Sequence, residues 1–292
     1  MKKILILSAL FCVILSAVPR VTSVEALDMD HDALMPVFGA GGENILYRSS
    51  DGLYRYDIDK GTSSRFAESG YDPVMDAEGI IRYRVDNYEK GRRLTSLAVL
   101  DPETEELSYA FRNKRLDAAP KITDHGVYFV EKKAIKSDFA KASRIPDPVA
   151  FTYDNAVVLH FYGTSKVLRP AGDRPHLWPS VSPAQDKFCV VGGNDLFICD
   201  LDGNVLSKVN DARAPQWSPD GEWIAFMRDR DDGHVITGSD IYLVDKNGEN
   251  IIRLTDSNEL FEMYPQWSPD GSKIICDNPA DGKPVLITLE MK

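Results

Sequence analysis

The chain has 292 residues and is acidic, with 45 Asp and Glu against 34 Lys and Arg and a formal net charge of −11. Such a surface repels phosphate backbones, and no basic block offsets it, so we expect neither nucleic acid nor anionic lipid as a partner. Apart from Cys12, only Cys189, Cys199 and Cys276 are present, too few for a disulfide framework, and we expect buried free thiols.

The N-terminus has the pattern of a secretory signal. Two lysines precede an apolar run of fifteen residues, Ile4–Val18, whereas a membrane span needs about 20. Small residues allow cleavage after Ala17, which gives a signal peptide at residues 1–17, or alternatively after Ala26. No later segment is long and apolar enough to cross a bilayer. We therefore expect an exported protein, periplasmic or secreted, without a transmembrane segment after signal cleavage.

A proline recurs at the start of six similar units. It stands at Pro36, Pro73, Pro120, Pro179, Pro215 and Pro265. The intervals are 37, 47, 59, 36 and 50 residues, with a mean of about 46, which is the spacing expected of four-stranded propeller blades. No helical period of useful length is present. The sequence predicts an all-β fold, in which residues 18–292 form a single six-bladed β-propeller with blades starting near residues 36, 73, 120, 179, 215 and 265.

The second and third units are the irregular ones. Asn87–Arg93 is a short basic insertion in the second unit. The excess length of the third unit lies in Lys132–Asn155, a locally basic segment that includes Lys132, Lys133 and Lys136. An insertion on a rigid scaffold often carries specificity, but a solvated loop explains the segment equally well. Together the two segments would form a basic rim that faces an acidic partner or a uronic sugar.

The fourth unit predicts a hairpin from two apolar runs, DKFCVVGG and DLFICD. The turn between Cys189 and Cys199 has an even length. Because side chains alternate along a strand, the two thiols should point to opposite faces of the sheet.

The fifth and sixth units share the stretch PQWSPDG, at Pro215–Gly221 and Pro265–Gly271. Its second half is a tight turn, in which Pro presets φ, Asp caps nearby amides and Gly accepts a positive φ. We expect this turn to be the corner at which each blade leaves its inner strand and doubles back. The repeated tryptophans, Trp217 and Trp267, should pack between blades.

The last unit, Tyr264–Lys292, lacks a fourth strand. An open sheet edge would expose unpaired amides and carbonyls. The N-terminal segment Arg20–Leu27 has the β-branched content to supply the missing strand, provided that cleavage falls after Ala17. We therefore predict a ring that is closed by an N-terminal strand.

The segments PQWSPDGEWIAF and SDIYLVDKNGENIIRLT of the fifth unit resemble repeats of the TolB-type six-bladed β-propellers of the bacterial periplasm. That family carries an α/β domain before its propeller, whereas here we expect the first blade to begin near Met35 and no such domain before it. The resemblance therefore implies the propeller as a binding platform rather than the Tol–Pal envelope role. Propellers of this kind serve as scaffolds, lyases and gating domains.

Candidate binding residues stand at the starts of blades and in the third unit. Trp178 and Tyr264 lie off the repeat, where they could stack on a sugar, anchor a partner peptide or pack. His176 falls near a predicted inner strand, two positions before Trp178. With Lys132, Lys133 and Lys136, these residues are the predicted site.

The alternative function is that of a metal-dependent polysaccharide lyase of the oligogalacturonate type. Related lyases hold a divalent metal with histidines near the propeller channel, and His125 and His176 both fall near inner strands here. No nucleophile motif such as Gly-x-Ser-x-Gly is present. The favoured interpretation is non-catalytic, with no cofactor. It is a monomeric, exported platform that binds an envelope protein or glycan.

Overall fold

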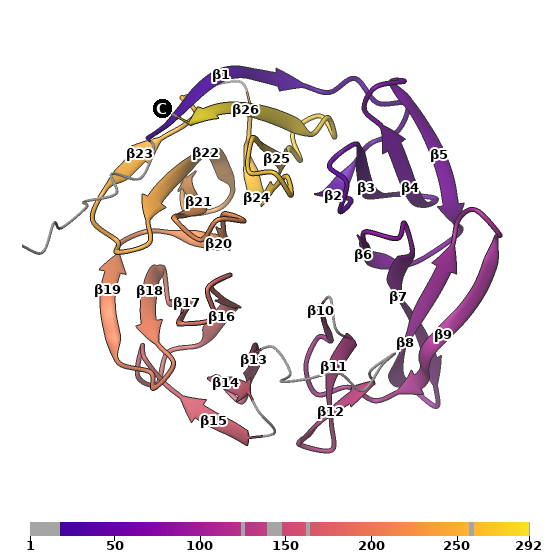
Figure 1. The fold of residues 1–292 in the computed structure, drawn as a ribbon, viewed down its shortest axis with the longest axis horizontal. Coiled ribbons are helices and arrows are strands. Elements are labelled where there is room, and N and C mark those ends of the chain that lie inside the picture. Colours follow the sequence, from indigo (N-terminus) through magenta and orange to yellow (C-terminus); the bar gives the residue numbers. More distant parts are fainter. Residues whose placement is uncertain (1–17, 124–125, 139–147, 162–163, 257–259, 292) are drawn as a thin grey trace, which may run out of the picture.

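The structure, a computed structural model, describes residues 18–123, 126–138, 148–161, 164–256 and 260–291. In these residues 26 strands form seven sheets, which stand around a central axis like the blades of a propeller (Figure 1). No helix in the described part of the chain has the length and hydrophobicity to span a bilayer.

Each blade is an antiparallel sheet whose first strand lies nearest the axis. Blade 1 contains β2 (Leu34–Phe38), β3 (Asn44–Ser49), β4 (Gly52–Asp57) and β5 (Thr62–Ala67), and blade 2 contains β6 (Tyr71–Met75), β7 (Ile81–Glu89), β8 (Arg92–Asp101) and β9 (Glu106–Lys114). Blade 3 contains β10 (Lys121–Thr123), β11 (Gly126–Glu131) and β12 (Ala134–Asp138), and blade 4 contains β13 (Val149–Tyr153), β14 (Ala156–Phe161) and β15 (Thr164–Leu168). Blade 5 contains β16 (His176–Val181), β17 (Lys187–Gly192), β18 (Asp195–Asp200) and β19 (Val205–Val209), and blade 6 contains β20 (Arg213–Trp217), β21 (Trp223–Asp231), β22 (Ile236–Asp245) and β23 (Ile251–Arg253). Blade 7 contains β24 (Met263–Trp267), β25 (Lys273–Asp277), β26 (Val285–Met291) and, on its outer edge, β1 (Pro19–Ala26).

The prediction of six blades is wrong, because the third predicted unit contains two blades. Blades 3 and 4 each show three strands in the described residues, so their combined length resembles one blade with an insertion. The predicted insertion Lys132–Asn155 contains β12 and the inner strand β13, with residues 139–147 outside the described part. The missed signal is Asp147-Pro148-Val149, which repeats the Asp72-Pro73-Val74 of blade 2.

The strand directions give the propeller two different faces. Because neighbouring strands are antiparallel, the hairpins between second and third strands lie on the face where the inner strands begin. In the blades that have four strands, the link to the next blade lies on that same face. We call it the top face, and the corner turns that follow the inner strands lie on the opposite face.

Five inner strands begin with a bulge at the recurrent proline. The residue before each of these prolines has a φ between 49° and 52°, namely Met35, Asp72, Trp178, Ala214 and Tyr264. The register shifts at the same place in all five strands. A proline favours extended conformations in the preceding residue, and a non-glycine residue with positive φ costs roughly 1–3 kcal/mol. The recurrent proline therefore marks a strained start of the inner strand on the top face.

The ring closes through the N-terminal strand, as the sequence predicts. β1 pairs with β26 in antiparallel register from Pro19 opposite Met291 to Ala26 opposite Val285. In Figure 1 the two strands run side by side, at opposite ends of the colour scale. β1 thus covers the edge of β26, which would otherwise present unpaired backbone groups.

The repeated corner forms as predicted from PQWSPDG. Ser218 Oγ accepts the N–H of Trp223 at 2.9 Å and donates to Asp220 Oδ1 at 2.5 Å, and Gly221 has a φ of 72°. Ser268 makes the equivalent contacts in blade 7.

The two repeated tryptophans pack between blades, which confirms the prediction. Trp217 Nε1 donates to Ser180 O of blade 5 at 3.3 Å, and Trp267 Nε1 donates to Gln216 O of blade 6 at 3.1 Å. Each indole therefore joins its blade to the preceding one.

The hydrophobic core consists of separate clusters between neighbouring blades, and the three cysteines of the described residues are buried in these clusters. Cys189 lies in the cluster between blades 5 and 6, and Cys199 in the cluster between blades 4 and 5. The thiols therefore point to opposite faces of blade 5, as predicted, and Cys276 is a third buried free thiol. Burial raises the pKa of both Cys189 and Cys199 to about 12, so these side chains stay protonated and inert.

Candidate binding site

A basic hollow of about 680 Å³ opens on the top face between blades 2 and 3. The hairpin of β7 and β8 forms one wall, and the link from β9 to β10 forms the other. The lining residues are Arg84, Gly91, Arg92, Arg93, Thr95, Arg115, Leu116, Asp117, Ala118 and Ala119. Four arginines and one aspartate thus line this hollow in a chain whose net charge is −11. We call this hollow the arginine pocket.

Tyr71 of β6 organises two of these arginines. Its ring lies under the Arg84 guanidinium at 4.3 Å and under that of Arg93 at 5.7 Å, measured from the guanidinium carbon to the ring centroid. Arg84 also forms an ion pair with Asp72, the bulge residue that follows Tyr71 in β6. Burial lowers the pKa of Arg84. Stacking and ion pairing therefore hold this guanidinium in place although it is partly desolvated.

Asp86 completes the support beneath Arg93. Arg93 Nε donates to Asp86 Oδ2 at 2.6 Å, and Arg93 Nη2 donates to the Tyr71 hydroxyl at 2.6 Å. Burial alone would raise the pKa of Asp86, but hydrogen bonds from Tyr71, Thr95 and Arg93 lower it overall. The hydrogen bonds that Arg93 donates to the Tyr71 hydroxyl and to Asp86 raise the pKa of Arg93. Both groups are therefore held in their charged forms and in fixed positions.

The other two arginines are exposed and carry uncompensated charge. Within the described residues, Arg92 and Arg115 have neither an ion-pair partner nor a side-chain hydrogen bond. Arg92 begins β8 at the tip of the hairpin, and Arg115 follows the end of β9. Their donors are free to meet an anionic group that enters the pocket.

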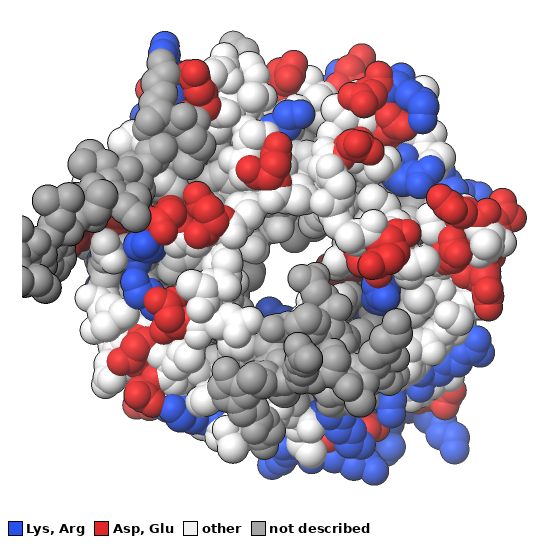
Figure 2. All heavy atoms as spheres, viewed as in Figure 1, with Lys and Arg blue, Asp and Glu red and all other residues white. Residues whose placement is uncertain are grey.

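The predicted basic rim forms in part at this pocket. The β11–β12 turn contacts the pocket wall, because the Lys133 N–H donates to Asp117 Oδ2 at 2.7 Å. Lys132 and Lys133 are exposed at this turn, whereas Lys136 is paired with Glu131 at 2.6 Å. Asn87–Arg93 forms the facing hairpin. Figure 2 shows Lys and Arg side chains gathered along the lower right edge of the view, the area of β9 and β12 in Figure 1.

Trp178 and Tyr264 lie outside the arginine pocket. Both are bulge residues, on the inner strands of blades 5 and 7. Trp178 is 38% exposed, whereas Tyr264 is partly buried against the core cluster between blades 6 and 7. Burial raises the pKa of Tyr264, in keeping with a packed phenol. Trp178 therefore stays available for a stacking contact, and Tyr264 contributes mainly to packing.

His176 is a buried structural residue. Its Nδ1 donates to Asn155 O at 2.7 Å, and its Nε2 accepts the N–H of Ala171 at 3.2 Å. Both ring nitrogens are thus engaged by backbone, which leaves none for a metal ion. His125 lies outside the described residues. Among the residues that are described, no group of three or more His, Cys, Asp or Glu side chains could hold a metal ion.

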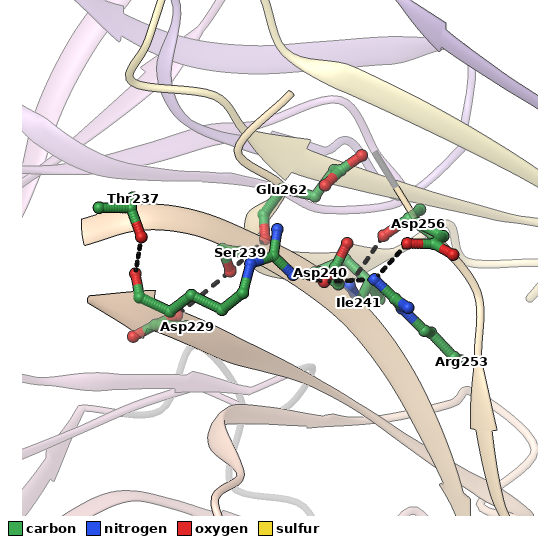
Figure 3. Close-up of polar contacts among 10 residues, drawn as sticks. Asp229, Thr237, Ser239, Asp240, Ile241, Arg253, Asp256 and Glu262 are labelled. Carbon is green, nitrogen blue, oxygen red and sulfur yellow. Dashed lines mark hydrogen bonds and ion pairs between the residues drawn. The ribbon is translucent and has the colours of Figure 1, made fainter. Parts of the chain in front are cut away.

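A second set of unusual groups is enclosed at the seam between blades 6 and 7 (Figure 3). Asp240 Oδ2 is bound by Arg230 and, at 2.8 Å, by Arg253. Glu262 is fully buried, and neither of its carboxylate oxygens has a hydrogen-bond partner in the described residues. Burial raises the pKa of Glu262 to about 7, and the charge of Asp240 adds to this effect. Asp240 and Glu262 are both buried, so these two carboxyl groups affect stability rather than binding, whereas the Arg230 and Arg253 side chains reach solvent.

Sequence reasoning missed Arg84, Arg115 and Tyr71. Arg84 and Arg115 are 31 positions apart and meet only because the blade 2 hairpin and the next blade-to-blade link share one face. The basic stretch Arg112–Arg115 was a usable signal, but the undivided third unit hid its position. Correct placement of blade 3 would have brought both segments together.

Comparisons with known proteins establish the fold and little beyond it. No family model matches the chain, so membership of the TolB type is not shown. An uncharacterized protein of Agrobacterium fabrum, Atu1656, is 30% identical over 110 residues, which cover 35% of this chain and 35% of that protein. The chain thus matches only about a third of the length of this relative.

Solved propellers resemble the chain along most of its length. The Swd1 β-propeller domain of Myceliophteria thermophila has a TM-score of 0.63 at 8% identity and covers 93% of this chain and 100% of its own. Hsv2 of Kluyvelomyces marxianus has a TM-score of 0.57 at 8% identity and covers 90% and 98%. The oligogalacturonate lyase of Vibrio parahaemolyticus has a TM-score of 0.50 at 10% identity and covers 87% and 76%. At these identities the likeness shows a β-propeller fold alone.

Proposed function

We propose that the protein is a non-catalytic binding platform whose arginine pocket holds carboxylate groups of an acidic partner. The observation that carries this proposal is the convergence of four arginines on one hollow of an acidic protein. We further propose that the platform is exported and that its partner is an envelope protein or glycan.

The pocket combines fixed and adaptable donors. Tyr71, Asp72 and Asp86 hold Arg84 and Arg93, so little conformational entropy is lost when a ligand binds them. Arg92 and Arg115 have free forks that match a carboxylate in bidentate geometry. The rest of the surface is acidic, which disfavours long polyanions and favours a short acidic segment.

Isothermal titration calorimetry with an oligogalacturonate and with a glutamate-rich peptide tests this function. We expect wild-type protein to bind at least one of them. R92A/R115A should bind at least about tenfold more weakly, because each hydrogen bond to a charged group contributes about 1.5–3 kcal/mol before solvent screening.

The matched control is R20A/R65A, which removes two exposed arginines that lie outside the pocket. It should bind as the wild type does. Equal loss in both double variants would mean that net charge, rather than the pocket, governs binding. Absence of binding to either ligand by the wild type would refute the proposed function.

A further inference from the structure

A smaller hollow of about 280 Å³ lies on the top face where blades 7, 1 and 2 meet. We call it the junction pocket. Its wall includes the bulge residues Met35 and Asp72, with Arg48, Tyr71 and Asp277. Neither the sequence patterns nor the arginine pocket accounts for it.

Asp277 is an unusual residue to find at such a wall. It is 5% exposed, and its Oδ1 has no hydrogen-bond partner in the described residues. Burial raises its pKa, and the N–H groups of Met35 and Asn278 offset only part of this effect. A buried acceptor without a donor costs about 1–3 kcal/mol. A carboxylate held at this cost beside a hollow indicates a donor that arrives with a ligand.

The other charged groups of the junction pocket leave room for such a donor. Asp72 is already paired with Arg84. Arg48 is exposed and has no ion-pair partner within the described residues. The junction pocket therefore offers one carboxyl group whose enclosed Oδ1 lacks a donor and one free basic donor, next to the apolar side chains of Leu34 and Met35.

The junction pocket and the arginine pocket are neighbours. Tyr71 belongs to the wall of the first, and its ring packs against Arg84 and Arg93 of the second. The ion pair of Asp72 with Arg84 joins the same two walls. A ligand that fills one pocket therefore needs to extend past only one tyrosine to reach the other.

We propose that the partner is an acidic peptide that binds by its free amino terminus, with the α-ammonium group on Asp277. The first peptide carbonyl then accepts from Arg48, and the first side chain contacts Leu34 and Met35. Acidic side chains further along the peptide lie on the arginine pocket. Capture of a chain terminus is a known mode of peptide recognition. This inference rests on the proposed function of the arginine pocket.

The test compares two glutamate-rich peptides that differ only at the N-terminus, one free and one acetylated, each with a fluorescent label at the C-terminus. Fluorescence anisotropy with wild-type protein should show at least tenfold weaker binding of the acetylated peptide. This arm needs no variant, so it cannot fail through misfolding.

D277N should bind both peptides equally, at the affinity of the wild type for the acetylated one. The matched control is E262Q, which also removes a buried carboxyl without a partner but lies outside the junction pocket. E262Q should keep the preference for the free amino terminus. Loss of that preference in both variants would contradict a specific role of Asp277.

The outcomes separate the two proposals. If the wild type binds both peptides equally while R92A/R115A binds neither, amine capture is refuted and the function of the arginine pocket stands. If neither peptide binds but an acidic oligosaccharide with free amino groups does, the assignment to a peptide is refuted. If no acidic ligand binds, the proposed function itself fails.

Discussion

Ser218 illustrates how much one hydroxyl contributes at the corner of a blade. Its Oγ accepts the buried N–H of Trp223 and donates to Asp220. The side chain is thus both the acceptor for a strand amide and the anchor of the turn. Because Ser268 makes the same contacts in blade 7, the two corners are independent tests of the same local chemistry.

S218A should destabilise the protein by about 1–3 kcal/mol, because the Trp223 N–H would lose its acceptor inside the protein. Urea unfolding followed by tryptophan fluorescence measures the change. S108A, which alters an exposed serine of β9, is the control and should change stability by less than about 0.5 kcal/mol. Equal stability of S218A and wild type would contradict the role given to this hydroxyl.

Glu262 makes the stability of the propeller depend on pH. Burial raises the pKa of its carboxyl group to about 7 in the folded protein, from the ordinary glutamate value of 4.5. The folded state therefore binds the proton more tightly than the unfolded state does. The stabilisation is fully present below about pH 4.5 and is lost as the pH rises through about 7. The difference corresponds to about 3 kcal/mol as an upper bound.

Thermal melting of the wild type and of E262Q at pH 5 and pH 8 tests this dependence of stability on pH. The wild type should lose more stability between the two values than E262Q, in which the group no longer titrates. E25Q, an exposed change on β1, should behave as the wild type does. A wild-type curve that coincides with that of E262Q would show that Glu262 does not titrate in this range.

The predictions from sequence were correct at positions that repeat between units. The Trp, Ser and Gly positions of PQWSPDG recur, so their common role in packing and turn formation was readable. Arg84, Tyr71 and Asp277 are single residues, and what makes each of them notable is a neighbour on another strand or another blade. Their contacts depend on tertiary structure and could not be predicted from spacing.

At the scale of elements, the N-terminal strand decides whether the ring is closed. β1 covers the edge of β26, and Val21 packs against the core cluster between blades 6 and 7. Cleavage after Ala26 would remove the entire strand, whereas cleavage after Ala17 would keep it. Under the export proposed above, the mature protein should begin at Val18, which mass spectrometry of the processed chain can measure.

A chain of residues 27–292 should be markedly less stable than one of residues 18–292. Its open β26 edge would also pair between molecules. Denaturant unfolding and size-exclusion chromatography measure the two effects. Two chains with the same unfolding midpoint and the same monomeric elution would show that β1 is dispensable for closure.

The blade count shows where sequence periodicity fails for elements. Prediction from proline intervals works when every blade has the same number of strands. Blades 3 and 4 show three described strands each, and their inner strands begin only 28 positions apart, at Lys121 and Val149. The combined sequence length of the two short blades is therefore close to that of one blade with an insertion. The closing strand was predictable because an unpaired sheet edge exposes backbone N–H and C=O groups, which another strand must cover.

The charge of the protein and the arrangement of its blades together determine where an acidic ligand can bind. An acidic propeller repels acidic ligands at long range, so only a local concentration of fixed arginines can hold one. The top face provides that concentration because hairpins and blade-to-blade links of neighbouring blades meet there. Two lysine- and arginine-rich segments predicted that a basic rim exists. The position of the arginine pocket could be predicted only with the correct number of blades.

An NMR titration of protein labelled with ¹⁵N in its arginine side chains tests directly whether the arginine pocket binds an acidic partner. On addition of a glutamate-rich peptide, we predict that the Nε–H signals of Arg84, Arg92, Arg93 and Arg115 shift together, while those of Arg20 and Arg65 stay in place. Uniform small shifts of all arginines, or shifts confined to arginines outside the pocket, would contradict the claim that this pocket binds the acidic partner.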